Sequence, residues 1–316
     1  MATTIQVLEL IQFAIYGDHQ NFSQTAEKIA ENLMKRGHKL ESDQIKGWLK
    51  DYASSGKQET TSKLSYEQPD LDFTDLILPD SIMDQLKEVI LERKEREELS
   101  KYNLTPTKSI LLVGHPGTGK TLTASVLSHE LGLPLKEIRF TSFLDSKLGQ
   151  TGKDLSFLFN SIIEQTPGVY FFDEFDALAS QRSSASQGAE KEYNEIVNTI
   201  LKGMDHLAKS SNGSYIVAST NLESILDSAI KRRFDLTLHY PDTSTETAQR
   251  LLKHYLAGFK VLDKFSKTTL QVIARLNPAD IEKICSQAKK KAILYDQKIN
   301  DELLQNLAKQ RNDTNG

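Results

Sequence analysis

The sequence predicts an α/β fold in which helices cover both faces of a parallel sheet, with an all-helical C-terminal lid and a small N-terminal helical module. Between residues 109 and 240, short apolar runs typical of buried strands alternate with amphipathic helical segments, the pattern of a parallel sheet covered on both faces. A glycine-rich loop at 114–121 joins one such run to a helix. Beyond Pro241 only helical periodicity remains. We therefore expect an α/β core at 71–241 and a helical lid at 242–316.

Residues 1–54 are predicted to form the N-terminal module, which consists of three short helices. The apolar residues that recur at helical spacing are Ile5, Leu8, Ile11 and Ile15, then Ala26, Ile29, Ala30 and Leu33, and then Ile45, Trp48, Leu49 and Tyr52. Trp48 follows this period, so we expect it to anchor a small core. Two functions stay open, a partner-docking module and a helix-turn-helix that uses Lys35, Arg36, Lys39 and Lys46. The polar stretch 55–70 is predicted to be a linker.

The strands and helices of the core and lid follow from the same periodicities. Strands are expected at 110–113, 136–140, 169–172, 215–219 and 236–240. Core helices are expected at 79–99, 119–131, 155–163 and in a segment that ends at Leu207. Lid helices are expected at 246–256, 267–276, 279–295 and 301–309. Asn277 and Pro278 favour the start of the third lid helix, because Asn caps first-turn amides and Pro needs no N–H partner there.

The composition describes an ordinary chain of 316 residues, 38% hydrophobic and 26% charged, with a net charge of -4. This balance gives no general reason to expect nucleic-acid or anionic-membrane binding, and it mildly favours protein partners. No apolar run approaches the length of a spanning helix, and no basic segment precedes the first apolar run, so we expect no membrane association and a cytoplasmic location. The single cysteine, Cys285, lies on an apolar helical stripe, where we expect it to pack in a core.

The segment 114–121 fits the phosphate-loop pattern G-x-x-x-x-G-K-[ST], and it lies directly after the apolar strand 110–113. Glycines let the backbone wrap a phosphate, and the amides at the start of the next helix hold negative charge. Lys120 is expected to reach the β- and γ-phosphates, and the Thr121 hydroxyl is expected to bind Mg²⁺. The residues expected to bind ATP are Gly114, His115, Pro116, Gly117, Thr118, Gly119, Lys120, Thr121, Leu122 and Asp173.

A second acidic motif follows at 169–174, where four apolar strand residues end in Asp173 and Glu174. Asp173 is expected to hold the metal through water, and Glu174 is expected to polarise the water that attacks the γ-phosphate. A strand that ends in two carboxylates is common by itself. At this distance after a phosphate loop, it makes nucleotide hydrolysis the leading interpretation.

Together these motifs resemble one family, the AAA ATPases of the AAA+ superfamily, over residues 71–307. The loop differs from the usual GPPGTGKT only at His115, and 169–174 is similar to the family's hhhhDE. The strand 218–221 resembles the sensor-1 strand, which implies that Asn221 places the attacking water. The segment 226–235 is similar to the arginine-finger region of the katanin and spastin type. The resemblance implies that Arg232 and Arg233 complete a neighbour's site, so the active form is a homo-hexameric P-loop NTPase ring.

Three further segments are assigned through this resemblance. Residues 277–281 are similar to the S-G-A-D-I segment that opens the lid helix, with Asn-Pro in place of Ser-Gly. The corresponding segment of relatives implies that 76–78 gives apolar cover to the base. The first pore loop aligns at Lys147, Leu148 and Gly149, with Lys147 where relatives carry an aromatic residue; Phe143 lies close in sequence and could supply a ring.

The leading functional hypothesis is an ATP-hydrolysing ring that remodels, unfolds or disassembles a protein, with the N-terminal module and the pore contacting a substrate or adaptor. Two alternatives stay open. One is a nucleic-acid-linked AAA+ helper of helicase-loader or transposition type, in which Lys147 faces phosphates. The other is a nucleotide-switched regulator of an enzyme partner such as a protease.

Overall fold

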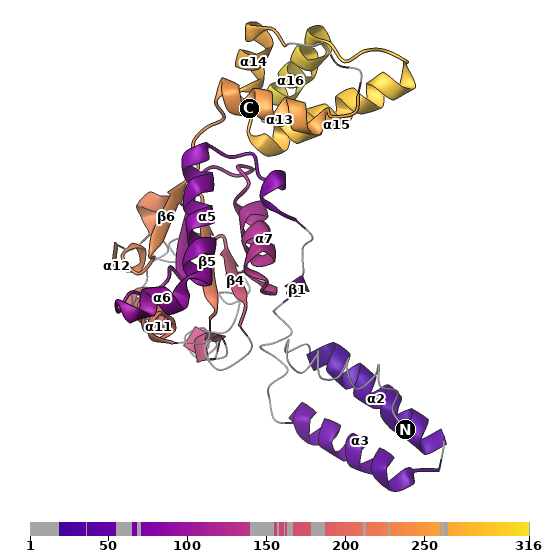
Figure 1. Cartoon of the computed structure of the whole chain (residues 1–316), viewed down its shortest axis with the longest axis vertical. Coiled ribbons are helices and arrows are strands. Elements are labelled where there is room, and N and C mark those ends of the chain that lie inside the picture. Colours follow the sequence, from indigo (N-terminus) through magenta and orange to yellow (C-terminus); the bar gives the residue numbers. More distant parts are fainter. Residues whose placement is uncertain are drawn as a thin grey trace.

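The computed structural model describes residues 19–35, 37–54, 65–67, 71–139, 155–156, 158–160, 162, 167–177, 187–210, 213–226, 228–259, 261 and 265–315. The helix expected around 5–15 lies outside these residues, as do the pore-loop residues Lys147, Leu148 and Gly149 and nearby Phe143. Figure 1 shows a central sheet with helices packed beside it, the four lid helices at one end and a helical hairpin near the N-terminus. The predicted α/β class is confirmed.

The sheet has the strand order β1-β3-β4-β5-β2-β6. Its five parallel strands are β3 (Leu135–Arg139), β4 (Val169–Asp173), β5 (Tyr215–Thr220), β2 (Ser109–Val113) and β6 (Leu236–His239). Because β2 lies between β5 and β6, the loop that follows it opens at the carboxyl edge of the sheet, one strand in from the end formed by β6. Ligands of open parallel sheets bind at this edge.

An additional strand, β1 (Ser65–Glu67), pairs antiparallel with β3 at the edge of the sheet. These residues lie in the segment predicted to be a linker. The segment Ser-Tyr-Glu has no alternation of apolar side chains that would indicate a strand. This short edge strand is formed by main-chain pairing with β3, and therefore no local sequence pattern predicts it.

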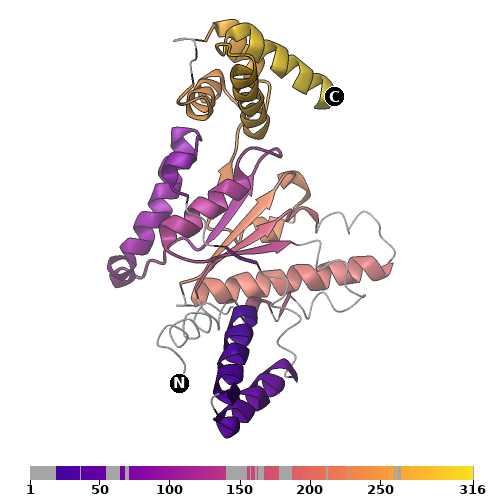
Figure 2. The same ribbon diagram turned by 90° about the vertical axis from the view of Figure 1, so that its right-hand side faces the viewer.

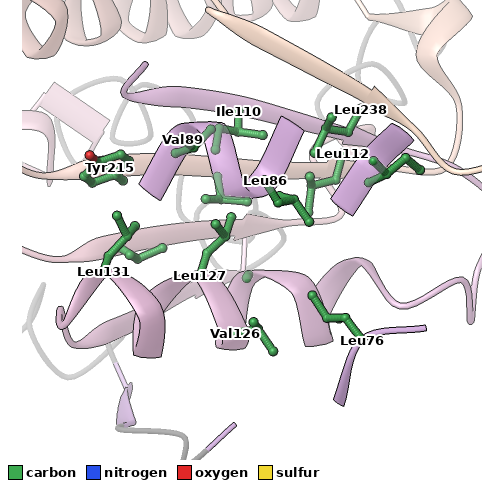
Figure 3. Close-up of a cluster of buried hydrophobic side chains, with 14 of the residues drawn as sticks. Leu76, Leu86, Val89, Ile110, Leu112, Val126, Leu127, Leu131, Tyr215 and Leu238 are labelled. Carbon is green, nitrogen blue, oxygen red and sulfur yellow. The ribbon is translucent and has the colours of Figure 1, made fainter. Parts of the chain in front are cut away.

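Successive side chains of each parallel strand point to opposite faces of the sheet. Both faces are buried, which explains the nearly continuous apolar runs in the sequence. On one face, α5 (Asp80–Lys94) and α7 (Lys120–Leu131) cover Ile110, Leu112 and Val217, and Figure 3 shows part of this cluster. On the other face, Leu111, Phe172 and Ala218 pack with residues of α11 (Gln187–Lys209). Figure 2 shows α11 running along the sheet on the side opposite α5.

The helix predicted at 79–99 is divided into α5 and a shorter α6 (Arg96–Lys101). The division falls at Glu95, inside a run of charged residues. Such a run carries no apolar stripe, so its periodicity gives no signal for the end of one helix and the start of the next.

The lid consists of α13 (Thr245–Tyr255), α14 (Lys267–Ile273), α15 (Pro278–Leu294) and α16 (Asp301–Asn315). Ser244, Ser266 and Asn277 cap the first three by accepting first-turn amides. Cys285 is fully buried in the lid core, as predicted, and burial raises the pKa of its thiol to about 12.

The N-terminal hairpin pairs α2 (His19–Lys35) with α3 (Lys39–Ser54). Its buried residues include Ala26, Ile29 and Ala30. The prediction for Trp48 is wrong, because this side chain is 67% exposed. On α3 the inner face passes through Ser42 and the half-buried Leu49, and Trp48 lies about 100° around the helix from Leu49.

Candidate nucleotide site

The phosphate loop runs from the end of β2 to the start of α7. Gly117 and Gly119 have φ values of +78° and +98°, a region that favours glycine. Gly114 is required for a different reason, because a Cβ at this position would lie 2.6 Å from Cβ of Tyr240. Thr118 Oγ1 donates to the carbonyl of His115 at 2.8 Å and closes the loop on itself. The loop therefore has the open, glycine-dependent backbone that a phosphate needs.

Tyr240 is held rigidly beneath the loop. Its amide donates to the carbonyl of Val113 at 2.7 Å, and its buried hydroxyl donates to Thr123 Oγ1 at 2.6 Å. Burial raises the pKa of Tyr240, so its phenol stays protonated. Sequence reasoning assigned Tyr240 only to a strand; its position under Gly114 follows from the pairing of β6 with β2.

A cavity of about 460 Å³ opens beside the loop. Its polar end is lined by loop residues and by Lys120, Thr121, Asp173, Glu174 and Asn221. Its other end is lined mainly by apolar residues, namely Leu76, Ile77, Leu78, Leu251, Tyr255, Pro278 and Ala279, together with Asp75 and Glu282. A polar end joined to a mainly apolar end fits a nucleotide, with phosphates on the loop and the base under the lid. Sequence reasoning missed Leu251, Tyr255 and Glu282, since only the packing of the lid brings them here.

Lys120 is a buried cation at the first position of α7. Its ammonium donates to the carbonyls of Gly114 at 2.6 Å and His115 at 3.0 Å, and to Asn221 Oδ1 at 2.9 Å. Burial lowers the pKa of Lys120, although the nearby carboxylates of Asp173 and Asp176 act in the opposite direction. These bonds satisfy the three ammonium protons and place the charge inside the loop.

Asp173 and Glu174 lie at the carboxyl end of β4. Asp173 Oδ1 accepts from Ser219 Oγ at 2.5 Å and from the amide of Glu174 at 3.0 Å. Glu174 has φ +54°, a strained conformation for a residue with a side chain, and its side chain is exposed. Ser219 was not predicted to contact Asp173. The parallel pairing of Phe172 with Ala218 places the next residues opposite each other, and this register was the missing signal.

The structure does not bring Arg232 and Arg233 to this cavity. The carbonyl of Arg233 accepts from Ser109 Oγ at 3.0 Å, and Ser109 is the first residue of β2. The phosphate loop follows the last residue of that strand, about 13 Å further along. Arg233 also forms an ion pair with Asp205 of α11, with Nε 2.7 Å from Oδ1. The two arginines thus lie at the opposite end of β2 from their own phosphate loop.

Hydrogen bonds join the lid to the core near the cavity. The amide of Ala279 donates to the carbonyl of Gly117 at 3.1 Å. Arg250 Nη1 donates to the carbonyl of Leu78 and to Asp80 Oδ1, both at 3.2 Å. Gly117, Leu78 and Ala279 line the cavity themselves, so these contacts join the lid directly to the wall of the nucleotide cavity.

This parallel sheet, with its glycine-dependent loop after an inner strand and an acidic strand end nearby, defines a phosphate-loop nucleotide-binding domain. Residues 110–242 match the family described as "ATPase family associated with various cellular activities (AAA)". Residues 110–242 therefore form a domain of the AAA ATPase family.

Several known proteins resemble the chain. An uncharacterized AAA family ATPase, y4kL, of Sinorhizobium fredii is 29% identical over 89% of this chain and 87% of its own length. The proteasome-activating nucleotidase of Methanothermobacter thermautotrophicus is 29% identical over 70% of this chain, and an ATP-dependent zinc metalloprotease FtsH of Petrotoga mobilis is 31% identical over 68%. The chain spans only 55% and 34% of these two relatives.

A solved structure shares the fold. The crystal structure of the FIGL-1 AAA domain matches 80% of this chain and 89% of its own, with a TM-score of 0.61 and 20% sequence identity. Within the described part of the chain, no helix combines the length and the apolar character needed to cross a bilayer.

Proposed function

We propose that the protein hydrolyses ATP and uses the resulting motions of a ring to remodel a protein substrate. The observation that carries this proposal is the convergence of Lys120, Asp173, Glu174 and Asn221 on one cavity beside the phosphate loop. They come from three different elements, the start of α7 and the carboxyl ends of β4 and β5. Three separate strand and helix ends supply the charged and polar groups that γ-phosphate cleavage requires.

ATP is the substrate in this proposal, and the loop binds its phosphates. The Lys120 ammonium, held by two loop carbonyls and Asn221, exchanges these acceptors for phosphate oxygens. Glu174 orients and deprotonates the attacking water, while Asn221 fixes the position of that water. The Thr121 hydroxyl and the Asp173 carboxylate suit Mg²⁺, an ion that prefers oxygen ligands and keeps several waters. When bound, Mg²⁺ neutralises charge on the β- and γ-phosphates.

The site is completed by a second copy of the chain. Arg232 and Arg233 cannot serve their own phosphate loop, because a whole strand separates them from it. A neighbouring subunit that presents this end of β2 places a guanidinium on the γ-phosphate, where such a group accelerates cleavage by about three to five orders of magnitude. A closed ring provides one such contact at every interface.

A protein substrate is favoured over nucleic acid by the N-terminal hairpin. Trp48 and Leu40 are 67% and 79% exposed and lie with Gln44 on one face of α3. Tryptophan is enriched at protein-binding surfaces, and the exposed Leu40 adds apolar area beside it. Two relatives, a proteasome-activating nucleotidase and an ATP-dependent zinc metalloprotease, are also named for work on proteins. The two competing functions are a nucleic-acid-linked helper and a nucleotide-switched regulator of an enzyme, and the following experiment distinguishes them from remodelling.

The test uses Glu174→Gln as a trap. This variant is expected to bind ATP like the wild type and to lose turnover, because the amide cannot accept the proton of the attacking water. Tagged Glu174→Gln is loaded with ATP, treated with nuclease and isolated from a native lysate. Glu97→Gln, which alters an exposed carboxylate on α6, is the matched control and should hydrolyse ATP at the wild-type rate.

Remodelling is supported if a defined protein survives nuclease treatment, leaves the ring when ATP is replaced by ADP, and accelerates wild-type hydrolysis when added in pure form. Recovery of nucleic acid alone would support the helper function instead. A partner whose own activity changes with the bound nucleotide, while it stays folded, would support the switch. Unchanged turnover by Glu174→Gln would overturn the assignment of the base.

A further inference from the structure

The first turn of α15 rests directly on the phosphate loop. Besides the hydrogen bond from Ala279 to the Gly117 carbonyl, the side chain of Asn277 fills the space beside Gly117. A Cβ on Gly117 would lie 2.9 Å from Cγ and Oδ1 of Asn277 and 3.2 Å from Cβ of Ala279. Pro278 and Ala279 also line the nucleotide cavity. The position of this turn therefore controls both the loop and the cavity wall.

The amides of this turn are already used within the protein. Pro278 has no N–H, the amide of Ala279 donates to Gly117, and the amide of Asp280 donates to Asn277 Oδ1 at 2.8 Å. The amide of Ile281 donates to the carbonyl of Asn277 at 3.1 Å. The turn consequently has no spare donor among these four residues for a phosphate. Its contribution to binding is to hold the loop and the wall in place.

The Asp280 carboxylate at this turn carries a buried charge, with a side chain that is 6% exposed. Arg311 of α16 neutralises it: Nε lies 2.8 Å and Nη2 lies 2.7 Å from Asp280 Oδ1. Lys283 lies 3.9 Å from the same oxygen but belongs to α15 itself. The arginine contact thus ties the last helix of the chain to the turn that holds the phosphate loop.

We propose that Arg311 is a positioning residue for nucleotide binding, acting through Asp280 on the first turn of α15. This inference rests on the proposed function, since it takes ATP as the ligand of the cavity. Removal of the guanidinium leaves a buried carboxylate without its main counter-charge, and the turn moves toward solvent to hydrate it. The loop and the cavity wall then lose their support, whereas Glu174 and Asn221 on the core strands stay in place.

The experiment compares Arg311→Gln, Arg311→Lys and the control Lys283→Gln in the full-length chain. Affinity for a fluorescent ATP analogue, and KM and kcat for ATP hydrolysis, are measured for each. Arg311→Gln is expected to raise both Kd and KM about tenfold through misplacement of the turn, with kcat within about twofold of wild type. Arg311→Lys keeps a positive charge but cannot place two guanidinium N–H groups on Asp280. It is therefore expected to retain part of the affinity for the ATP analogue. Lys283→Gln is expected to behave as wild type.

The double variant Asp280→Asn with Arg311→Gln separates positioning from general destabilisation. It removes the buried charge together with its partner, so it stays folded even if Arg311→Gln does not. If Arg311 acts through the charge of Asp280, the double variant has no uncompensated carboxylate, so its KM is expected to lie below that of Arg311→Gln; Asp280→Asn alone is measured beside it. Additive effects would show that the two residues act separately and would overturn the proposal.

Two other results have clear meanings. A folded Arg311→Gln variant with wild-type Kd and KM overturns the positioning role and leaves the proposed function intact. A wild-type chain that binds no ATP analogue refutes the proposed function and, with it, the proposed role of Arg311 in nucleotide binding.

Discussion

The Lys120 ammonium and the Asn221 side-chain oxygen are joined by a hydrogen bond of 2.9 Å, which links the start of α7 to the end of β5. The same ammonium bonds two carbonyls of the phosphate loop. One cation therefore holds together the group that binds phosphate and the group proposed to place water. The two residues have different roles in the proposed reaction, and their variants are expected to differ accordingly.

Lys120→Met is expected to weaken ATP binding about a hundredfold, because it removes the only side-chain cation that the described residues place inside the loop. Asn221→Ala is expected to keep the affinity within a few-fold and to lower kcat about a hundredfold, because the water loses its orienting partner. Titration with a fluorescent ATP analogue and steady-state hydrolysis distinguish the two. Equal loss of affinity in both variants would contradict this division.

Gly114→Ala is expected to destabilise the core by about 1–3 kcal/mol and to weaken nucleotide binding. Tyr240 cannot retreat from the new methyl group, because its amide and hydroxyl are both hydrogen-bonded. Gly47→Ala on α3 is the control, since its Cβ meets nothing within 4 Å. Urea unfolding and nucleotide titration check both variants; an unperturbed Gly114→Ala would mean that β6 can move away from the loop.

Arg232→Ala and Glu174→Gln are each expected to be inactive alone, yet a mixture of the two should recover activity. At equal amounts, about a quarter of the interfaces combine an intact Glu174 with an intact neighbouring arginine. The measurement is the hydrolysis rate after the two variants are mixed and allowed to exchange subunits. Absence of recovery, with exchange demonstrated by labelled subunits, would argue against an arginine supplied by the neighbour.

Arg233 is expected to behave differently from Arg232, because Asp205 already holds it. Among the described residues Arg232 is exposed and has no such ion pair. The mixing experiment is therefore repeated with Arg233→Ala, and Asp205→Asn serves as its control. Similar losses in Arg233→Ala and Asp205→Asn would assign Arg233 to anchoring the loop after α12 (Ser228–Lys231).

Because Lys136 is buried, we expect the free energy of unfolding of the protein to depend measurably on pH. Its side chain is 1% exposed and donates to the hydroxyl of Tyr170 at 2.8 Å, and burial lowers its pKa from 10.5 to about 8. Between these two values the unfolded chain binds more protons than the folded chain, so the free energy of unfolding rises with pH, by about 3 kcal/mol at most. Below pH 8 the full cost of the buried charge is present.

Lys136→Met removes this titration. The free energy of unfolding of the variant minus that of the wild type is expected to be largest near pH 7 and to fall as pH rises toward 10. Urea unfolding at pH 7, 8, 9 and 10 measures it, and Lys202→Met, at an exposed position of α11, should give a flat difference. A flat difference for Lys136→Met as well would show that its pKa is not lowered by folding.

Cys285 offers a probe of lid opening, because it is the single cysteine of the chain and fully buried. Its raised pKa and its burial both suppress the thiolate at pH 8, so a thiol reagent is expected to react at least about a hundredfold more slowly than in guanidinium. The ATP analogue should slow the reaction further if the lid closes on it. Rapid labelling of the native protein would indicate that the lid core opens freely.

Much of the candidate site could be predicted from sequence because its residues follow local patterns. Lys120 and Thr121 belong to a loop with a defined spacing, and Asp173 and Glu174 end an apolar strand. The parallel sheet followed from alternating apolar runs. Trp48 shows the limit of such reasoning, because a helical period of apolar residues does not say which of them face the partner helix.

The contacts of Ser219 with Asp173, of Tyr240 with Gly114 and of Arg311 with Asp280 were invisible in the sequence. Each joins residues that are distant along the chain, and each depends on strand register or on the packing of the lid. The sequence by itself determined the chemical groups of the site and their positions at the ends of strands, because the spacing of neighbouring residues sets where a strand ends and which side chain follows it. The separation of Arg232 and Arg233 from their own loop, and the link from the last helix to that loop, were decided by tertiary structure alone, because strand order and helix packing are long-range properties that no local pattern carries.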